Sequence, residues 1–374
     1  MIYLDNAATT LTNINVLKFM TPYLTDEFFN PSSSYSSVDA PMQAINTARS
    51  EIAQFINAKT DEIYFTSGGS ESNNWAIKGV AFANAHRGKH IITSKIEHKS
   101  VLNACKWLEK QGFEVTYLDI NEQGFINWEK FRTSLRKDTI LASIMFANNE
   151  IGTIQPIREI GVLCHDNNTF LHTDATQAFG HIETDVRFLG VDLLTASGHK
   201  VNAPKGVGIL YIKNGTTIDP LIHGGSQEHG MRGGTYNVPG IVGMGEATRI
   251  HSSLFLDTDI RDYFIDQVQT HIPIAKLNGA GHYRLPNNIN FRFEGLNGTT
   301  IAAMLDMADI YVSTGSACNS LSGEPSYVLK AIGLSDEEAN SSVRFTISPE
   351  TTKEEIDIVV KKLIEITNYL EGIR

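Results

Sequence analysis

Residues 170–212 read FLHTDATQAFGHIETDVRFLGVDLLTASGHKVNAPKGVGILYI, and three apolar segments in this stretch are expected to be buried β-strands. They are FLHTDA (170–175), DLLTAS (192–197) and VGILYI (207–212). Upstream, similar segments are separated by amphipathic stretches typical of helices, for example at 73–87. This alternation predicts an α/β fold with a largely parallel sheet that helices cover on both faces. Further strands are expected at EIYFTS (62–67), HIITS (90–94), EVTYLD (114–119) and ILASIMFAN (140–148), and a further helix at 99–111.

The pattern changes after about residue 250, where the sequence indicates a smaller α+β unit. At 374 residues the chain exceeds what one hydrophobic core usually serves, which favours two domains. We expect a large domain at 16–252 and a small domain at 253–374, with an N-terminal segment, 1–15, that packs with the small domain. The elements expected in the small domain are helices near 257–271, 298–308 and 352–371, and strands at 287–293 and 310–313.

The composition excludes several classes of protein. A formal net charge of -11 argues against a broad nucleic-acid interface, which needs concentrated Lys and Arg. No segment approaches the roughly 20 apolar residues of a membrane-spanning helix, and the start MIYLDNAATT lacks the features of a secretory signal. Three cysteines without CxxC spacing indicate neither a disulfide framework nor a zinc site. We therefore expect a cytoplasmic protein with no metal site and no direct contact with nucleic acid or membrane.

A phosphate site is indicated where the first buried segment ends, in TSGGSESNN (66–74). Small residues such as Gly69 let backbone N–H groups approach an anion, and the N-terminus of the following helix adds partial positive charge. Ser70 adds a hydroxyl donor. The motif is not a Walker loop, since no Lys-Ser/Thr follows the glycines. A serine-capped helix explains the same residues about equally well.

Two other strand ends carry the side chains of a cofactor site. Asp174 lies in HTDATQ, where a buried carboxylate needs a partner such as a protonated ring nitrogen, and Gln177 is in reach of the same ring. A metal ligand or a helix cap would also account for Asp174 alone. Lys200 follows the next buried segment, in SGHK, and suits Schiff-base formation, although a single lysine is more often a surface charge. A phosphate cradle, an acid and a lysine at strand ends together favour a cofactor site.

Two further strand ends fit the same pocket. His98 in IEHKSV is placed to lie on a planar cofactor and to exchange protons. Taken alone, a structural histidine is the more common explanation. Asn149 in NNEIGT places an amide within reach of a cofactor hydroxyl or a substrate carboxylate, and its alternative is an Asn-rich turn.

These motifs, together with HGGSQEHGMRGGTYN, STGSACNS and EPSYVLKAIG, resemble those of the cysteine desulfurases, in particular the subgroup with a long Cys loop. The similarity extends from YLDNAATT to the final helix. It implies a fold-type-I transferase that depends on pyridoxal 5'-phosphate. The large cofactor-binding domain would contain a mostly parallel seven-stranded sheet, and the smaller C-terminal domain would be α+β.

The resemblance implies a role for each cofactor-binding residue. Lys200 would hold the cofactor covalently, Asp174 would pair with the ring nitrogen and Gln177 would contact the ring hydroxyl. His98 would stack on the ring and act as acid and base. The residues implied to hold the phosphate are Gly69, Ser70, Ser197, His199 and, across a homodimer interface, Thr235 of the partner subunit.

Cys318 lies in the Gly- and Ser-rich stretch STGSACNSLSGEP, where an exposed thiol is expected to have a chemical task. Cys105 and Cys164 lie in apolar runs typical of buried structural cysteines. By the resemblance, Asn149 and Arg344 receive the carboxylate of L-cysteine, and an arginine fork suits that task. L-Cysteine would become L-alanine, and its sulfur would form a persulfide on Cys318.

Sulfur-acceptor proteins would take the persulfide, either an iron–sulfur scaffold or a tRNA-thiolation enzyme. Relatives that serve the scaffold often carry a C-terminal extension, and the chain stops at Arg374, which mildly favours another acceptor. A selenocysteine lyase or cysteine sulfinate desulfinase would use the same residues. An aminotransferase would not need the Cys318 loop, and a degenerate, non-enzymatic sulfur carrier would not need Lys200 and Asp174.

The sequence departs from the family pattern at a few positions. Tyr35 stands where the family usually has a histidine, and VNAPKG, with Asn202, replaces IYGPKG. The second arginine of the usual RFSLGR is absent after Arg344. Ser70 replaces a threonine and keeps a hydroxyl. The first three differences leave substrate preference and rate open.

Overall fold

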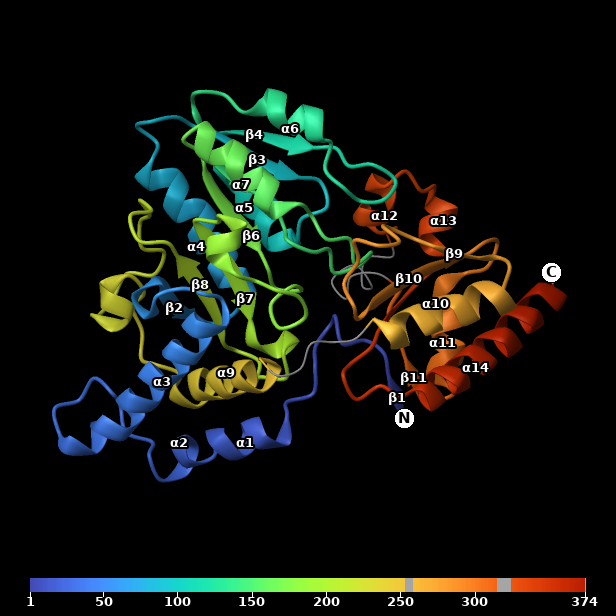
Figure 1. The fold of residues 1–374 in the computed structure, drawn as a ribbon, viewed down its shortest axis with the longest axis horizontal. Coiled ribbons are helices and arrows are strands. Elements are labelled where there is room, and N and C mark those ends of the chain that lie inside the picture. Colours follow the sequence, from blue (N-terminus) through green and yellow to red (C-terminus); the bar gives the residue numbers. More distant parts are fainter. Residues whose placement is uncertain (253–257, 315–323, 374) are drawn as a thin grey trace.

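The computed structural model describes residues 1–252, 258–314 and 324–373, and Figure 1 shows its ribbon. Its largest sheet has seven strands in the order β2-β8-β7-β6-β5-β3-β4. Strands β4, β3, β5, β6 and β7 run parallel to one another, whereas β8 is antiparallel to both β7 and β2. The mostly parallel seven-stranded sheet is therefore confirmed. The strands are β2 (Ile63–Thr66), β3 (His90–Ser94), β4 (Glu114–Leu118), β5 (Thr139–Ser143), β6 (Phe170–Asp174), β7 (Leu193–Ser197) and β8 (Gly208–Ile212).

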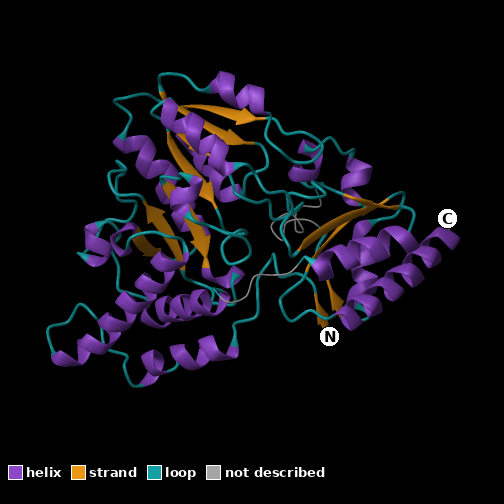
Figure 2. Ribbon diagram, in the orientation of Figure 1, coloured by secondary structure: helices purple, strands orange, loops and turns teal. Residues whose placement is uncertain are grey.

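Helices cover both faces of this sheet (Figure 2). They are α1 (Ile14–Met20), α2 (Pro22–Thr25), α3 (Asp39–Phe55), α4 (Gly69–Ala83), α5 (Lys99–Glu109), α6 (Trp128–Ser134), α7 (Ile157–Asp166), α8 (Val186–Leu189) and α9 (Val238–His251). Leu193 and Leu210 belong to a buried cluster that includes residues of α4 and α5. Their neighbours Leu194 and Ile209 belong to a second cluster, with residues of α3, α7 and α9. Successive strand residues point to opposite faces, so both faces bury apolar side chains.

A separate buried core, distinct from the two clusters on the faces of the large sheet, forms around a three-stranded antiparallel sheet, β12-β10-β9, near the C-terminus. The first strand of the chain, β1, pairs with β11 in parallel, and Leu4 is buried in the same core. Figure 1 shows this N-terminal segment beside the C-terminal elements. No helix in the described ranges is long and apolar enough to cross a membrane. The elements are β1 (Ile2–Tyr3), α10 (Asp259–His271), β9 (Ala275–Leu277), β10 (Asn288–Phe293), α11 (Gly298–Asp306), β11 (Ile310–Tyr311), α12 (Tyr327–Ala331), α13 (Asp336–Asn340), β12 (Ser342–Thr346) and α14 (Lys353–Gly372).

One expected strand is shorter than predicted. The apolar run at 140–148 predicts a single strand, but β5 ends at Ser143. The side chain of Asn148 accepts hydrogen bonds from the backbone N–H groups of Glu150 (2.8 Å) and Ile151 (3.0 Å). Such side-chain bonds compete with strand pairing and turn the chain. The apolar residues beyond the strand are buried all the same.

Two buried elements were not predicted. Helix α9 is buried over most of its surface, so its sequence has no apolar stripe of helical period. Strand β12 has five residues and all are buried, Arg344 included, so it lacks the alternation of a half-buried strand. Neither element shows a periodic pattern in its sequence, because an element buried on all sides has no alternation of apolar and polar residues.

Candidate active site

A cavity of about 320 Å³ opens where the parallel strands end. Its lining comes from the ends of β2, β3, β5, β6 and β7 and the residues that follow them, from the N-terminal segment, and from β12. Ligands of open α/β sheets bind at this edge. The sequence-predicted residues that line it are Gly69, Ser70, His98, Asn149, Asp174, Gln177, Ser197, His199, Lys200 and Arg344.

One end of the cavity is built to receive an anion. Helix α4 begins at Gly69, where an added Cβ would lie 3.0 Å from Thr176 Oγ1 and 3.7 Å from Ser197 Cβ. Gly68 before it has a φ of +146°, a conformation that favours glycine. The Thr176 hydroxyl is buried and has no hydrogen-bond partner among the described residues. Backbone N–H groups at a helix N-terminus and a hydroxyl in need of a partner suit a phosphate.

Asp174 lies deeper, at the end of β6, with only 4% of its surface exposed. Its carboxylate accepts hydrogen bonds from Asn73 Nδ2 (2.7 Å) and Thr176 N (2.9 Å). Within the described ranges it has no ion pair with a lysine or arginine. A buried carboxylate in such a place is stabilised by a bound cation.

His98 is linked to Asp174 through two residues that the sequence analysis did not single out. Asn73 Nδ2 also donates to Ser100 Oγ (2.9 Å), and Ser100 Oγ lies 2.7 Å from His98 Nδ1. The backbone N–H of Ser100 donates to the same nitrogen (3.2 Å). Because Nδ1 accepts, the proton of the neutral ring is assigned to Nε2. Burial lowers the pKa of His98, although the charge of Asp174 opposes that shift, so the ring is neutral at neutral pH.

Lys200 follows β7, and its Nζ donates hydrogen bonds to the carbonyl oxygens of Ala7 (2.6 Å) and Ala8 (2.7 Å). Beside it, His199 Nδ1 lies 3.2 Å from Thr9 Oγ1. Burial, together with the charge of Lys200, lowers the pKa of His199 to about 4. The imidazole of His199 is therefore neutral near pH 7, and it adds no positive charge to this part of the cavity.

The N-terminal segment is the part of the cavity that the sequence analysis missed. Ala7 and Ala8 line the cavity, and Ala7 also accepts a hydrogen bond from Gln177 Nε2 (3.1 Å). These contacts use backbone carbonyls. The one available signal was the run of small residues in NAATT, which carries no specific chemistry.

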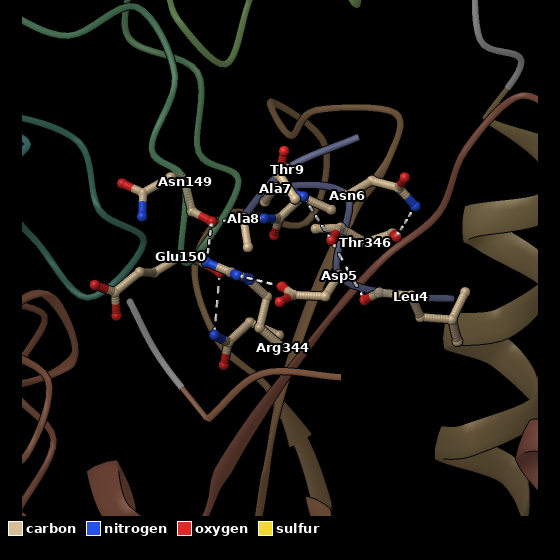
Figure 3. A network of polar contacts seen from close by, with 12 residues as sticks. Leu4, Asp5, Asn6, Ala7, Ala8, Thr9, Asn149, Glu150, Arg344 and Thr346 are labelled. Carbon is tan, nitrogen blue, oxygen red and sulfur yellow. Dashed lines mark hydrogen bonds and ion pairs between the residues drawn. The ribbon is translucent and has the colours of Figure 1, made fainter. Parts of the chain in front are cut away.

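Arg344 projects from β12 and is 1% exposed (Figure 3). Its Nη1 donates to the backbone carbonyl of Asn149 (3.1 Å), and its Nη2 donates to Asp5 Oδ1 (2.6 Å). Its Nε is buried without a partner in the described parts of the chain. The guanidinium therefore has N–H donors left for another acceptor.

Two predicted site residues, Thr235 and Cys318, remain to be considered, together with the other two cysteines. Thr235 is exposed and does not line the cavity of its own chain. Cys318 lies outside the described residues. Cys105 and Cys164 are buried and unpaired, and burial raises the pKa of Cys105 to about 12 and raises that of Cys164 as well. Neither thiol is readily ionised.

The family model described as aminotransferase class-V matches residues 2–359, and the chain belongs to this family. A protein of Methanosarcina thermophila named cysteine desulfurase IscS is 50% identical, over 99% of this chain and 93% of its own length. A solved structure titled "NifS-like protein" has a TM-score of 0.92 and 35% identity, and the match covers 99% of this chain and 100% of that chain. Another, titled "SspA in complex with cysteine", has a TM-score of 0.85 and 39% identity over 94% of this chain and 100% of that one. Within the class-V family, the chain is thus one of the cysteine desulfurases, as its motifs predict.

The cavity fits the pyridoxal 5'-phosphate on which this family depends. Asp174 supplies a buried carboxylate for a protonated ring nitrogen, and Lys200 supplies an amine. The unpartnered hydroxyl of Thr176, next to the start of α4, supplies a donor for a phosphate. The three groups line one cavity, so a cofactor with these three features is matched at each of them.

Proposed function

We propose that this protein converts L-cysteine to L-alanine with bound pyridoxal 5'-phosphate and collects the sulfur on Cys318. The observation that carries the proposal is a single cavity that contains the amine of Lys200, the carboxylate of Asp174 and the guanidinium of Arg344. An amine, a buried acid and a carboxylate receptor are the groups that a cofactor-dependent reaction of an amino acid requires.

Each cofactor-binding residue has a proposed task. Lys200 holds the cofactor covalently, Asp174 pairs with its ring nitrogen, and Gln177 contacts its ring hydroxyl. When bound, the cofactor draws electrons away from the bonds at Cα of the amino acid. The proposed phosphate ligands are Gly69, Ser70, Ser197, His199 and Thr235 of the partner subunit.

Proton movements fall to Lys200 and His98. When it is not bound to the cofactor, the amine of Lys200 would act as the base that takes the proton from the substrate Cα. The Ala7 and Ala8 carbonyls, 2.6 and 2.7 Å from Nζ, stabilise the ammonium that results. His98 would stack on the cofactor ring, and because its Nδ1 accepts from Ser100 N it presents an N–H at Nε2, so in the resting state it is a proton donor. It becomes an acceptor once that proton has left.

Asn149 and Arg344 are proposed to hold the substrate carboxylate, which fixes the amino acid on one side of the cavity. The thiolate of Cys318 then attacks the substrate sulfur. An S–S bond forms, the C–S bond breaks, and its electron pair stays on carbon, which takes up a proton to become the methyl group of alanine. The raised pKa of Cys105 and the buried position of both other cysteines favour Cys318 for this task.

Two features of the described residues support a homodimer. A proposed phosphate ligand lies outside the cavity of its own chain, and an apolar surface is exposed. Thr235 is exposed outside its own cavity. Near the N-terminus, large apolar side chains are exposed, and a hollow of about 380 Å³ lies between α1, α3 and α9. Exposed apolar areas of this kind mark interfaces. The exposed side chains are Leu11, Ile14, Leu17, Phe19, Leu24, Phe28 and Tyr35.

The remaining proposals concern organisation and partners. Residues 16–252 would form the large domain and 253–374 the small one, with 1–15 attached to the small domain; the burial of Leu4 in the C-terminal core supports this division. The persulfide would pass to an iron–sulfur scaffold or to a tRNA-thiolation enzyme in the cytoplasm. The net charge of -11 supports transfer to a protein rather than directly to nucleic acid.

The test of this function is a balance of products. Purified protein loaded with pyridoxal phosphate is incubated with L-cysteine and a thiol reductant, and alanine and sulfide are measured. Equal amounts of the two are expected. Absence of alanine would refute the proposal. If kcat/KM is higher with L-selenocysteine or cysteine sulfinate than with L-cysteine, that compound is the preferred substrate instead.

A further inference from the structure

Arg344 connects the cavity to an acidic residue that does not line it. The guanidinium faces the cavity, whereas Asp5, whose Oδ1 accepts from Arg344 Nη2 at 2.6 Å, is not among the lining residues. Figure 3 shows Asp5 on the N-terminal segment, with Asn149 on the other side of the guanidinium. The proposed carboxylate receptor therefore already carries one anion before any substrate arrives.

The position of Asp5 is fixed by its neighbours in the chain. Leu4 O accepts from Thr346 N (2.7 Å), Asn6 Nδ2 donates to Thr346 O (2.8 Å), and Ala7 N donates to Thr346 Oγ1 (2.9 Å). Thr346 and Arg344 belong to the same strand. None of these three hydrogen bonds uses the side chain of Asp5, so the segment has attachments to β12 that do not depend on it.

The ion pair changes how Arg344 binds a second anion. Arg344 is 1% exposed, and charges in such surroundings interact strongly because water screens them little. With Asp5, the pair has no net charge, and a substrate carboxylate must share the guanidinium with a neighbouring negative charge. The buried Nε, which has no partner in the described residues, leaves a donor for this second carboxylate.

We propose that Asp5 is a positioning and specificity-determining residue that sets, through Arg344, how tightly the site binds the carboxylate of its amino acid. The inference rests on the proposed function, in which Arg344 receives that carboxylate. Asp5 orients the guanidinium by its hydrogen bond and weakens anion binding by its charge. Because L-cysteine and L-alanine carry the same carboxylate, a moderate grip also lets the product leave.

The two effects of Asp5 are separable by Asp5→Asn, which keeps an oxygen acceptor and removes the charge. Holoenzyme is titrated with L-alanine and with L-alaninamide, which lacks the carboxylate, and dissociation constants are measured by calorimetry. For Asp5→Asn we expect L-alanine to bind about tenfold more tightly, because the competing charge is gone. L-Alaninamide should bind within about twofold of its original affinity.

Asp309→Asn is the matched control. It makes the same chemical change at the turn before β11, where Asp309 has a φ of 57° that asparagine tolerates. Its affinities should equal those of the unchanged protein, and both variants should unfold at similar temperatures. If L-alanine affinity in Asp5→Asn is unchanged or weaker while the protein remains folded, the inference is wrong and Asp5 only supports the N-terminal segment.

Arg344→Ala separates this inference from the function on which it rests. It should abolish the preference for L-alanine over L-alaninamide. If that preference persists, Arg344 does not hold the carboxylate, and the proposed function fails at this residue. If Arg344→Ala removes the preference but Asp5→Asn leaves it unchanged, only the role of Asp5 is refuted.

Discussion

The Nζ of Lys200 lies 2.6 Å from the carbonyl oxygen of Ala7, which is 193 positions away in the sequence. The same oxygen accepts from Gln177 Nε2 at 3.1 Å. The proposed reactive amine is thus held by main chain from the N-terminal segment. The position of the Lys200 amine therefore depends on contacts with the N-terminal segment.

Lys200→Ala should lose the visible absorbance of covalently bound cofactor and all turnover, because Lys200 is the only lysine among the described residues that line the cavity. Lys205→Ala is the control, since Lys205 is exposed and does not line the cavity. It should keep both properties, as read by the absorption spectrum and by alanine production. Absorbance that survives in Lys200→Ala and disappears in Lys205→Ala would reassign the covalent bond.

Cys318→Ser should bind cofactor and L-cysteine normally but release little alanine and carry no persulfide. A hydroxyl is far less acidic than a thiol, so it cannot take the sulfur. Mass spectrometry of the intact protein after reaction measures the persulfide. Cys105→Ala and Cys164→Ala, which alter buried thiols, should retain the persulfide, and normal alanine production by Cys318→Ser would exclude Cys318 as the acceptor.

A site shared between subunits predicts complementation. Lys200→Ala destroys the chemistry of its own site, whereas Thr235→Ala, in our proposal, weakens the site of its partner. Mixed dimers of the two variants contain one intact site, so refolding them together should restore roughly a quarter of full activity, measured at limiting cofactor. No recovery, in preparations shown to contain mixed dimers, would contradict a shared phosphate site.

The buried carboxyl of Glu97 predicts a dependence of stability on pH. Burial raises its pKa from 4.5 to about 8, against hydrogen bonds from Ser94 and Met145 that lower it. Because the folded pKa lies above the unfolded one, its stabilising contribution is complete below about pH 4.5 and is lost as pH rises through about 8.

Glu97→Gln has nearly the same shape but does not ionise. Urea unfolding at several pH values should show similar free energies of unfolding near pH 4.5. Above pH 8 the variant should be more stable by on the order of 3 kcal/mol. A constant difference across this range would mean that Glu97 does not titrate on folding.

The sequence was sufficient to place in one cavity the residues whose side chains are unusual at a strand end. Asp174 and Lys200 follow apolar runs, and a charge in that position has few explanations. The strands themselves were found because buried runs of Ile, Val and Leu are bounded by turns. Their order in the sheet and the antiparallel direction of β8 required the structure.

Other parts of the site had no comparable signal. The carbonyls of Ala7 and Ala8 are available to any residue type, so sequence letters do not reveal their use. Asn73 and Ser100 connect Asp174 to His98, and only the folded chain brings these residues together. Asn73 Nδ2 lies 2.7 Å from Asp174 Oδ2 and 2.9 Å from Ser100 Oγ. The Asp5–Arg344 pair likewise joins two ends of the sequence.

The pairing of Leu4 with Thr346 has a consequence for how the protein is made. The two residues are 342 positions apart, so Leu4 finds its partner only after Thr346 has been synthesised. Contacts over such separations form late in folding. The seven-stranded sheet can assemble earlier, but the cavity wall that contains Ala7 and Arg344 forms only after β12 has been made. A nascent chain therefore lacks a complete cavity until β12 has been made and has paired with the N-terminal segment.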